Sequence, residues 1–231
     1  PDDIAIAADG KKWVFLGENH ATAPHQQLHA DVIAALVKRG RKVMVGLEML
    51  TRPKQTPLDQ FWKGESLRSQ FLKDGDWKGQ WGYGYNFYSP IFEVCRTHRV
   101  PMVALNVPRD WVRTVGQKGF AGLTPEQTKD LPSIMALDNA NHRAVFASLM
   151  GGHPPTGPRG ENIYAAQVLW DEGMADSAAW APQAQTGAER IRVLQAIERK
   201  LLWLSSWTIH HANHLRPSRD KLKVGGHQAS C

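Results

Sequence analysis

The chain has few cysteines and no long apolar run, and each shortage excludes a class of protein. Only Cys95 and Cys231 are cysteines among its 231 residues, so at most one disulfide can form and a disulfide-stapled scaffold is excluded. They match no paired-cysteine metal motif. No stretch approaches about 18 consecutive apolar residues, so no transmembrane helix is predicted. Nothing reads as a signal peptide, and the first residue is Pro1, which leaves the compartment open.

What is present is the composition of a folded domain with its basic charge at one end. The chain is 42% hydrophobic and 22% charged, which fits a soluble chain with a real core. The net charge is +6. Residues 1–186 hold 20 Lys/Arg against 19 Asp/Glu, whereas residues 187–231 hold 8 against 3. We therefore divide the chain into a nearly neutral domain, 1–186, and a basic tail, 187–231.

The apolar pattern predicts an α/β fold, with a mostly parallel central sheet flanked by helices. Strands are expected over 12–17, 42–47 and 101–105, because each is a short apolar run bounded by turn residues. Helical spacing and capping residues predict that the segments between these strands are mainly helical, with Ser66 and Ser89 as N-caps. Strands that alternate with helices favour a parallel sheet. The expected helices are 25–39, 57–63, 66–73, 89–99, 108–118, a short one from 124, 133–150 and 161–180, and 190–207 reads as a further helix in the tail.

Polar side chains follow all three predicted strands. Glu18 and His20 come after the first, Glu48 after the second, and Asn106 and Arg109 after the third. Parallel strands emerge at one edge of a sheet, where ligands of such folds bind. Glu18, His20 and Glu48 therefore predict either a divalent-metal site or a general acid–base cluster.

A simpler interpretation of these groups stays open. Carboxylates and histidines after strands often cap the next helix or pair with a nearby arginine. His25 falls in the first turn of a helix, whose positive end favours neutral imidazole. His29, one turn later, is expected on a solvated face. Asn106 is a candidate for backbone hydrogen bonds in a turn.

The segment 77–88 is rich in aromatic residues. Its rings are expected mostly to cover the core or the sheet edge, although a phenolate can ligate ferric haem iron. Cys95 lies among apolar neighbours of a predicted helix and is expected to be a packed thiol rather than a nucleophile.

An ordered series of segments resembles the ChaN-like haem-binding lipoproteins, within the wider group of Tiki proteases and erythromycin esterases. The resemblance extends over about residues 13–180. It is carried by Phe15 to His20 with His25, Gly46 to Met49, Gln55, Leu58-Asp59, Tyr88 with Pro90 to Phe92, Ala104 to Arg109, Gly119, Leu123 to Gln127, Gly152 to Pro154, and Ala165 to Glu172 with Met174-Ala175.

The resemblance implies an α/β protein of the bacterial envelope, periplasmic or lipid-anchored to the outer membrane, that takes part in haem or iron uptake. It further implies two face-to-face haems shared by a homodimer, with tyrosine ligation, and an outer-membrane haem receptor as partner. Tyr88 is the tyrosine on a family position and so the expected iron ligand. His20 or His25 would orient the ligand near Asn106, and Arg109 and Arg113 would pair with the propionates.

The sequence leaves two other functions open beside haem binding. The relatives that hydrolyse substrates imply a metal-dependent hydrolase, with Glu18, His20 and Glu48 holding the ion and activating water. A nucleic-acid binder driven by the basic tail is not favoured, because no recognised binding fold accompanies the charge.

The end of the chain departs from the family pattern. Relatives continue after the Trp-Asp-Glu helix into a strand and a Gly-x-Gly-His turn, neither of which is recognisable in 190–231. We expect either a diverged end or a shifted reading frame from near residue 190, which sequencing the encoding DNA would decide. If the family's late histidine belongs to the site, this chain lacks one ligand.

Overall fold

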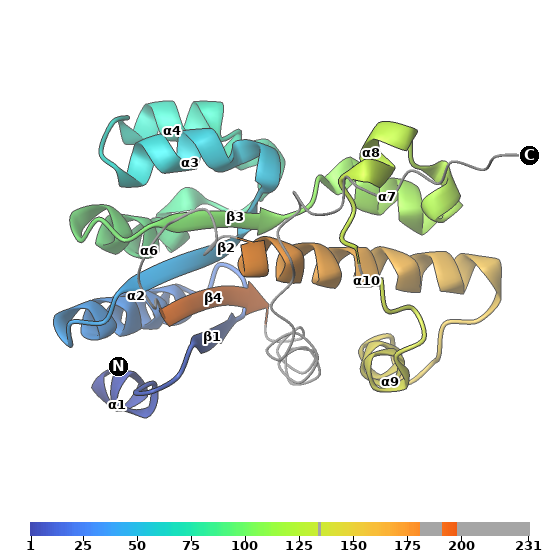
Figure 1. Ribbon diagram of the computed structural model, residues 1–231, viewed down its shortest axis with the longest axis horizontal. Coiled ribbons are helices and arrows are strands. Elements are labelled where there is room, and N and C mark those ends of the chain that lie inside the picture. The colour runs from blue at the N-terminus through green and yellow to red at the C-terminus, as the bar shows by residue number, and fades with distance from the viewer. Residues whose placement is uncertain (134, 181–190, 198–231) are drawn as a thin grey trace, which may run out of the picture.

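The computed structural model describes residues 1–133, 135–180 and 191–197, and it confirms the α/β class (Figure 1). The elements in chain order are α1 (Asp2–Ala7), β1 (Trp13–Glu18), α2 (Ala23–Lys38), β2 (Val43–Thr51), η1 (Arg52–Lys54), α3 (Gln55–Trp62), α4 (Arg68–Asp74), α5 (Trp77–Gln80), α6 (Tyr85–Thr97), β3 (Met102–Asn106), α7 (Arg109–Lys118), η2 (Phe120–Gly122), α8 (Pro125–Lys129), α9 (Ala140–Leu149), α10 (Gly157–Trp180) and β4 (Ile191–Ile197).

The sheet has the strand order β1-β4-β2-β3, and every pair in it is parallel. β2 is buried along its whole length. Its side chains alternate between the two faces, because Val43, Val45 and Leu47 belong to one core cluster and Met44 to another. A strand covered on both faces reads as a continuous apolar run, which is why the sequence signals it so clearly.

The predicted helix over 190–207 is wrong where the structure describes it. Ile191–Ile197 is the strand β4, inserted between β1 and β2, with Trp13 opposite Arg192 and Val43 opposite Ile191. Hydrogen bonding from both neighbours outweighs the helical spacing of this segment, and Val193 is fully buried. The strand expected to be missing after the Trp-Asp-Glu helix is therefore present. The other predictions for the tail concern 198–231, outside the described residues.

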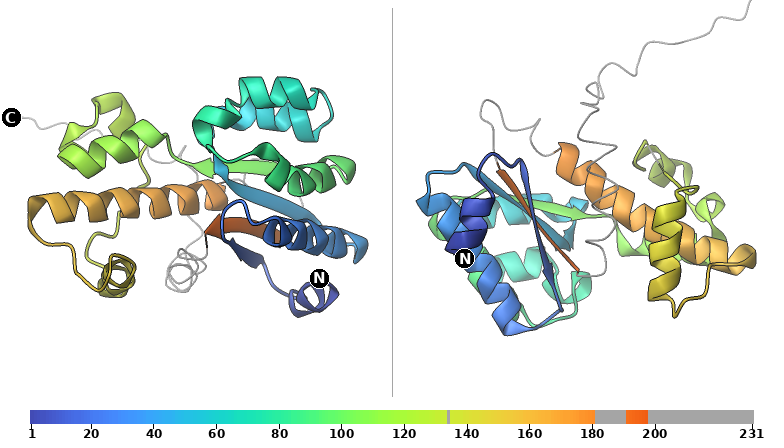
Figure 2. Two further views of the ribbon diagram at one scale, coloured as in Figure 1. Left: turned by 180° about the vertical axis from the view of Figure 1, so that it is seen from behind. Right: turned by 90° about the horizontal axis from the view of Figure 1, so that it is seen from below.

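Helices cover the two faces of the sheet unequally. The larger core lies between one face and the helices α2 and α6, and includes Leu36 and Phe92. The opposite face is covered by the C-terminal part of α10, where Met174 and Ala178 contact Val103 and Leu105. The N-terminal part of α10 extends beyond the sheet and lies with α7, α8 and α9. These helices form a helical extension beyond the carboxyl ends of the strands (Figures 1 and 2).

Several helix boundaries differ from the sequence prediction. α6 begins at Tyr85, capped by Gly84, so that Pro90 lies inside the helix instead of opening it after Ser89. The residue before α4 is Leu67 rather than Ser66, and no side chain caps it. The helix expected over 133–150 is restricted to Ala140–Leu149, where Asn139 accepts a hydrogen bond from the backbone N–H of His142. These shifts do not alter the order of the elements.

The expectation for Cys95 is confirmed. Cys95 is completely buried, and burial raises the pKa of its thiol far above the usual range. It is therefore a packed thiol. No helix among the described residues has the length and apolarity to cross a membrane.

Candidate functional site

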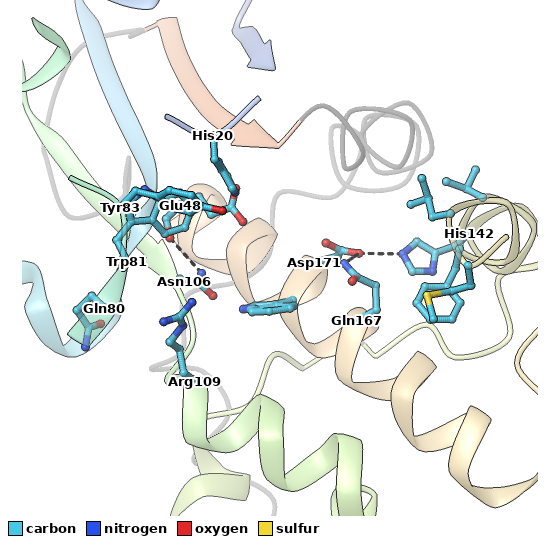
Figure 3. Close-up of a pocket in the computed structure, with 15 residues that line it drawn as sticks. His20, Glu48, Gln80, Trp81, Tyr83, Asn106, Arg109, His142, Gln167 and Asp171 are labelled. Atoms are coloured by element: carbon cyan, nitrogen blue, oxygen red, sulfur yellow. Dashed lines mark hydrogen bonds and ion pairs between the residues drawn. The ribbon is translucent and has the colours of Figure 1, made fainter. Parts of the chain in front are cut away.

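A cavity of about 330 Å³ lies where the carboxyl ends of the strands meet the helical extension (Figure 3). One wall comes from the strand ends and the α5–α6 segment, a second from the first turn of α7, and a third from α9 and α10. The strand-end wall consists of His20, Glu48, Asn106, Gln80, Trp81 and Tyr83, the α7 wall of Arg109, and the helical wall of His142, Val145, Phe146, Leu149, Met150, Gln167, Trp170 and Asp171.

The structure brings Glu18 and His20 into direct contact. Nδ1 of His20 lies 2.9 Å from Oε1 of Glu18. Glu18 is 3% exposed, and its carboxylate accepts hydrogen bonds, so His20 carries its proton on Nδ1. Nε2 then keeps its lone pair, and no described residue bonds to it. A carboxylate behind a histidine in this way fixes the tautomer and the orientation of the ring.

Glu18 also anchors the phenol of Tyr88. The Tyr88 hydroxyl donates to Oε1 of Glu18 at 3.0 Å and accepts from the backbone N–H of Ala21 at 3.2 Å. Tyr88 is fully buried and does not line the cavity. Burial raises the pKa of this phenol well above its usual range. The geometry therefore makes Tyr88 a support for Glu18.

The expectation that His29 lies on a solvated face is wrong. Its side chain is 3% exposed, Nε2 lies 3.1 Å from the carbonyl oxygen of Gly17, and Nδ1 lies 3.8 Å from Oε2 of Glu18. Burial lowers the pKa of His29, although the carbonyl of Gly17 and the charge of Glu18 oppose the shift. His29 is thus a neutral core histidine that supports the end of β1.

Glu48 is placed by an irregularity in the sheet. Leu47 pairs with Ala104, but the next pair joins Thr51 to Asn106, so the residues after Leu47 form a bulge in β2. Bulges redirect side chains near functional sites. The Asn106 amide donates to the carbonyl of Glu48 at 3.0 Å and accepts from the N–H of Val107. The backbone-bonding role expected for Asn106 is confirmed, and both Glu48 and Asn106 line the cavity.

Of the remaining predicted residues, only Arg109 reaches the cavity. It is exposed, and its guanidinium lies 3.5 Å from the carbonyl of Gly79. His25 is in the first turn of α2 as expected, where Nδ1 accepts the backbone N–H of Asn19. Arg113 is exposed on α7 and does not line the cavity.

Two rings of the aromatic segment 77–88, those of Trp81 and Tyr83, line the cavity. Gly82 has φ of +82°, which permits the turn between α5 and α6. The indole of Trp77 donates to the carbonyl of Tyr83 at 2.8 Å and fixes this turn. As a result the rings of Trp81 and Tyr83 lie 4.5 and 5.1 Å from that of His20. Tyr83 is 43% exposed.

The metal site predicted from Glu18, His20 and Glu48 finds no support. Among the described residues no group of three His, Cys, Asp or Glu side chains is arranged to hold a metal ion. Oε1 of Glu18 instead accepts hydrogen bonds from both His20 and Tyr88.

The helical wall carries a polar cluster that sequence reasoning missed. His142 is 6% exposed, with Nε2 3.0 Å from Oδ2 of Asp171 and Nδ1 2.9 Å from the hydroxyl of Tyr164. Gln167 donates to the same oxygen of Asp171 at 2.9 Å. The four-residue spacing of Gln167 and Asp171, on one helix face, was the available signal.

Comparisons with known proteins agree with this architecture. Residues 4–195 match the family described as haem-binding uptake, Tiki superfamily, ChaN. The fold is similar to a solved structure titled cofacial heme binding to ChaN of Campylobacter jejuni, with a TM-score of 0.59 and 16% identity, covering 85% of this chain and 74% of that one. No curated protein matches. The match to the family over most of the chain confirms the resemblance seen in the sequence, and the chain belongs to the ChaN family of haem-binding uptake proteins in the Tiki superfamily.

Proposed function

We propose that this protein binds haem in the cavity at the strand ends and serves haem or iron uptake in the bacterial envelope. The observation that carries the proposal is the placement of His20, whose Nδ1 is held by Glu18 while the ring is flanked by Trp81 and Tyr83. A nitrogen lone pair beside flat aromatic faces is suited to an iron tetrapyrrole. The envelope location rests on the family's function.

The residues of the cavity fit the chemistry of haem. Its apolar ring edge requires apolar walls, which Phe146, Leu149 and Met150 supply from α9. Its propionates require a cation near solvent, which the exposed guanidinium of Arg109 supplies. When bound, haem would supply a redox-active iron that can take a ligand from the protein.

Tyr83 is a better candidate than Tyr88 for a tyrosine ligand of the iron. Tyr83 lines the cavity and is partly exposed, whereas both hydrogen-bonding functions of the Tyr88 hydroxyl are used inside the protein. His20 is the second candidate, through Nε2. His25, in contact with Asn19, contributes indirectly by shaping the loop after β1.

A homodimer that shares cofacial haems is part of the proposal. The cavity is at the small end of the range for ligand sites, so part of a haem would protrude. Tyr83, Leu149 and Met150 are partly exposed where they line it, by 43%, 37% and 52%, and a second copy of the chain would cover both these groups and the protruding haem. Haem-dependent dimerisation in analytical ultracentrifugation, with one haem per chain, would support this arrangement. A haem-loaded monomer would contradict it.

Titration of the purified protein with hemin tests the central proposal. We expect a saturable shift of the Soret band that is weakened in His20→Ala. His98→Ala is the matched control, because His98 is exposed at the end of α6 and does not line the cavity. Absence of a saturable shift, or equal weakening in both variants, would contradict haem binding at this site. No observation here favours the hydrolase, which remains an untested prediction.

A further inference from the structure

The carboxylate of Asp171 is bonded on one side only. Its Oδ2 accepts from Nε2 of both His142 and Gln167. Its Oδ1 is buried and has no hydrogen-bond partner among the described residues. Figure 3 shows this oxygen on the side away from His142, toward the strand-end wall of the cavity. A buried acceptor oxygen without a partner is costly, and a positive charge in the cavity would lower that cost.

The groups behind Asp171 fix it as an acceptor. Burial raises the pKa of Tyr164 to about 12, so its phenol keeps the proton and donates to Nδ1 of His142. Nε2 of His142 then carries the hydrogen that Asp171 accepts. Oδ2 of Asp171 thus accepts from two donors, and its Oδ1 remains open.

No lysine or arginine forms an ion pair with Asp171 in the described part of the chain. The second carboxylate of the cavity, Glu48, is 4% exposed. The cation of the cavity lining, Arg109, is exposed and contacts a backbone carbonyl. The charged groups of the cavity are therefore separated. The carboxyl groups of Asp171 and Glu48 are buried inside, whereas the guanidinium of Arg109 is exposed.

Ferric haem has the complementary distribution. Its iron-porphyrin centre carries one positive charge, whereas the centre of ferrous haem is neutral, and in both the propionates are negative. We propose that Asp171, positioned by His142 and Gln167, makes the cavity selective for tetrapyrroles with a cationic centre, and so for ferric over ferrous haem. This inference rests on the proposed haem-binding function. The buried position matters because charge interactions are strong where water is excluded.

Two redox-inert porphyrins test the selectivity without iron. Gallium(III) protoporphyrin has a cationic centre and zinc(II) protoporphyrin a neutral one, on the same ring with the same propionates. We expect Asp171→Asn to lower the ratio of gallium to zinc affinity, measured by porphyrin fluorescence, on the order of ten-fold. Glu172→Gln is the matched control, because it makes the same charge change one residue along α10 on a buried side chain that does not line the cavity.

A second measurement uses the natural iron. In the hemin-loaded protein, Asp171→Asn should shift the midpoint potential to a more positive value in a titration with dithionite, and Glu172→Gln should shift it much less. Binding of all three porphyrins with ratios and potentials unchanged by Asp171→Asn would overturn the role of Asp171 and leave haem binding intact. Failure of every porphyrin to bind the folded wild-type protein would overturn both. If Asp171→Asn does not fold, the wild-type protein still provides a test. Tighter binding of zinc protoporphyrin than of gallium protoporphyrin overturns the inference, and tighter binding of gallium protoporphyrin supports it.

Discussion

Oε1 of Glu18 accepts hydrogen bonds from Nδ1 of His20 at 2.9 Å and from the Tyr88 hydroxyl at 3.0 Å. One buried carboxylate oxygen therefore joins a cavity residue to a core residue. His20 is part of the cavity, whereas Tyr88 comes from α6 and lies in the main core. The position of the imidazole is consequently tied to the packing of α6 on the sheet.

The first prediction concerns this carboxylate. Glu18→Gln should weaken hemin binding by about 10- to 100-fold, because groups that orient a metal-ligating histidine contribute on that scale. The imidazole ¹⁵N shifts of His20 should also move from a pure Nδ1–H tautomer toward a mixture. Glu65→Gln, an exposed neighbour of α3, is the control. An unchanged tautomer would show that Glu18 does not position His20.

The second prediction separates the two tyrosines. Tyr83→Phe should change the charge-transfer bands of bound ferric haem, because a phenolate ligand would be lost. Tyr88→Phe should leave those bands unchanged and instead lower the free energy of unfolding by about 1 kcal/mol, the contribution of a typical hydrogen bond. Spectra and urea unfolding of both variants check this. The reverse pattern would restore Tyr88 as the ligand.

Arg109 and Arg113 provide a third, matched comparison. Both are exposed on α7, four residues apart, but only Arg109 lines the cavity. Arg109→Ala should weaken hemin binding several-fold through loss of a charge-assisted bond to a propionate, and Arg113→Ala should not. Hemin dimethyl ester, which lacks the propionate charges, should bind wild type and Arg109→Ala equally. A preserved difference with the ester would exclude propionate pairing.

The sequence predicts those parts of the site that local pattern determines. Strands buried on both faces are visible as apolar runs, and their carboxyl ends place His20, Glu48, Asn106 and Arg109 at one cavity. Glu18, the last residue of β1 and two residues before His20, does not line the cavity. The two-residue spacing that suggested shared metal ligation instead produces a carboxylate–imidazole hydrogen bond.

Other parts depend on contacts between distant segments, which spacing cannot reveal. β4 takes its conformation from the two strands that enclose it. His29 is buried because the end of β1 packs over α2 and offers the Gly17 carbonyl. His142 and Asp171 are 29 residues apart on two helices, so their pairing follows only from the packing of α9 against α10.

The fourth prediction is a pH dependence of stability that arises from His29. Burial lowers its pKa in the folded protein below the ordinary value of 6.5, so below that pH the unfolded chain binds a proton that the folded chain does not. The stability contributed by neutral His29 is fully present above about pH 6.5, and it is lost as the pH falls toward and through the folded pKa. The slope for one such group is at most about 1.4 kcal/mol per pH unit.

Urea unfolding of wild type and His29→Gln at about pH 7 and pH 5 isolates this contribution. Glutamine retains a donor for the Gly17 carbonyl but does not titrate, so the variant should lose less stability on acidification than wild type. The carboxylates titrate in both proteins, so their contributions to the change in stability cancel when the two proteins are compared. His98→Gln, at an exposed histidine, should decline as wild type does. An equal decline in wild type and His29→Gln would mean that His29 accepts a proton in the folded state, with Glu18, 3.8 Å away, compensating for its burial.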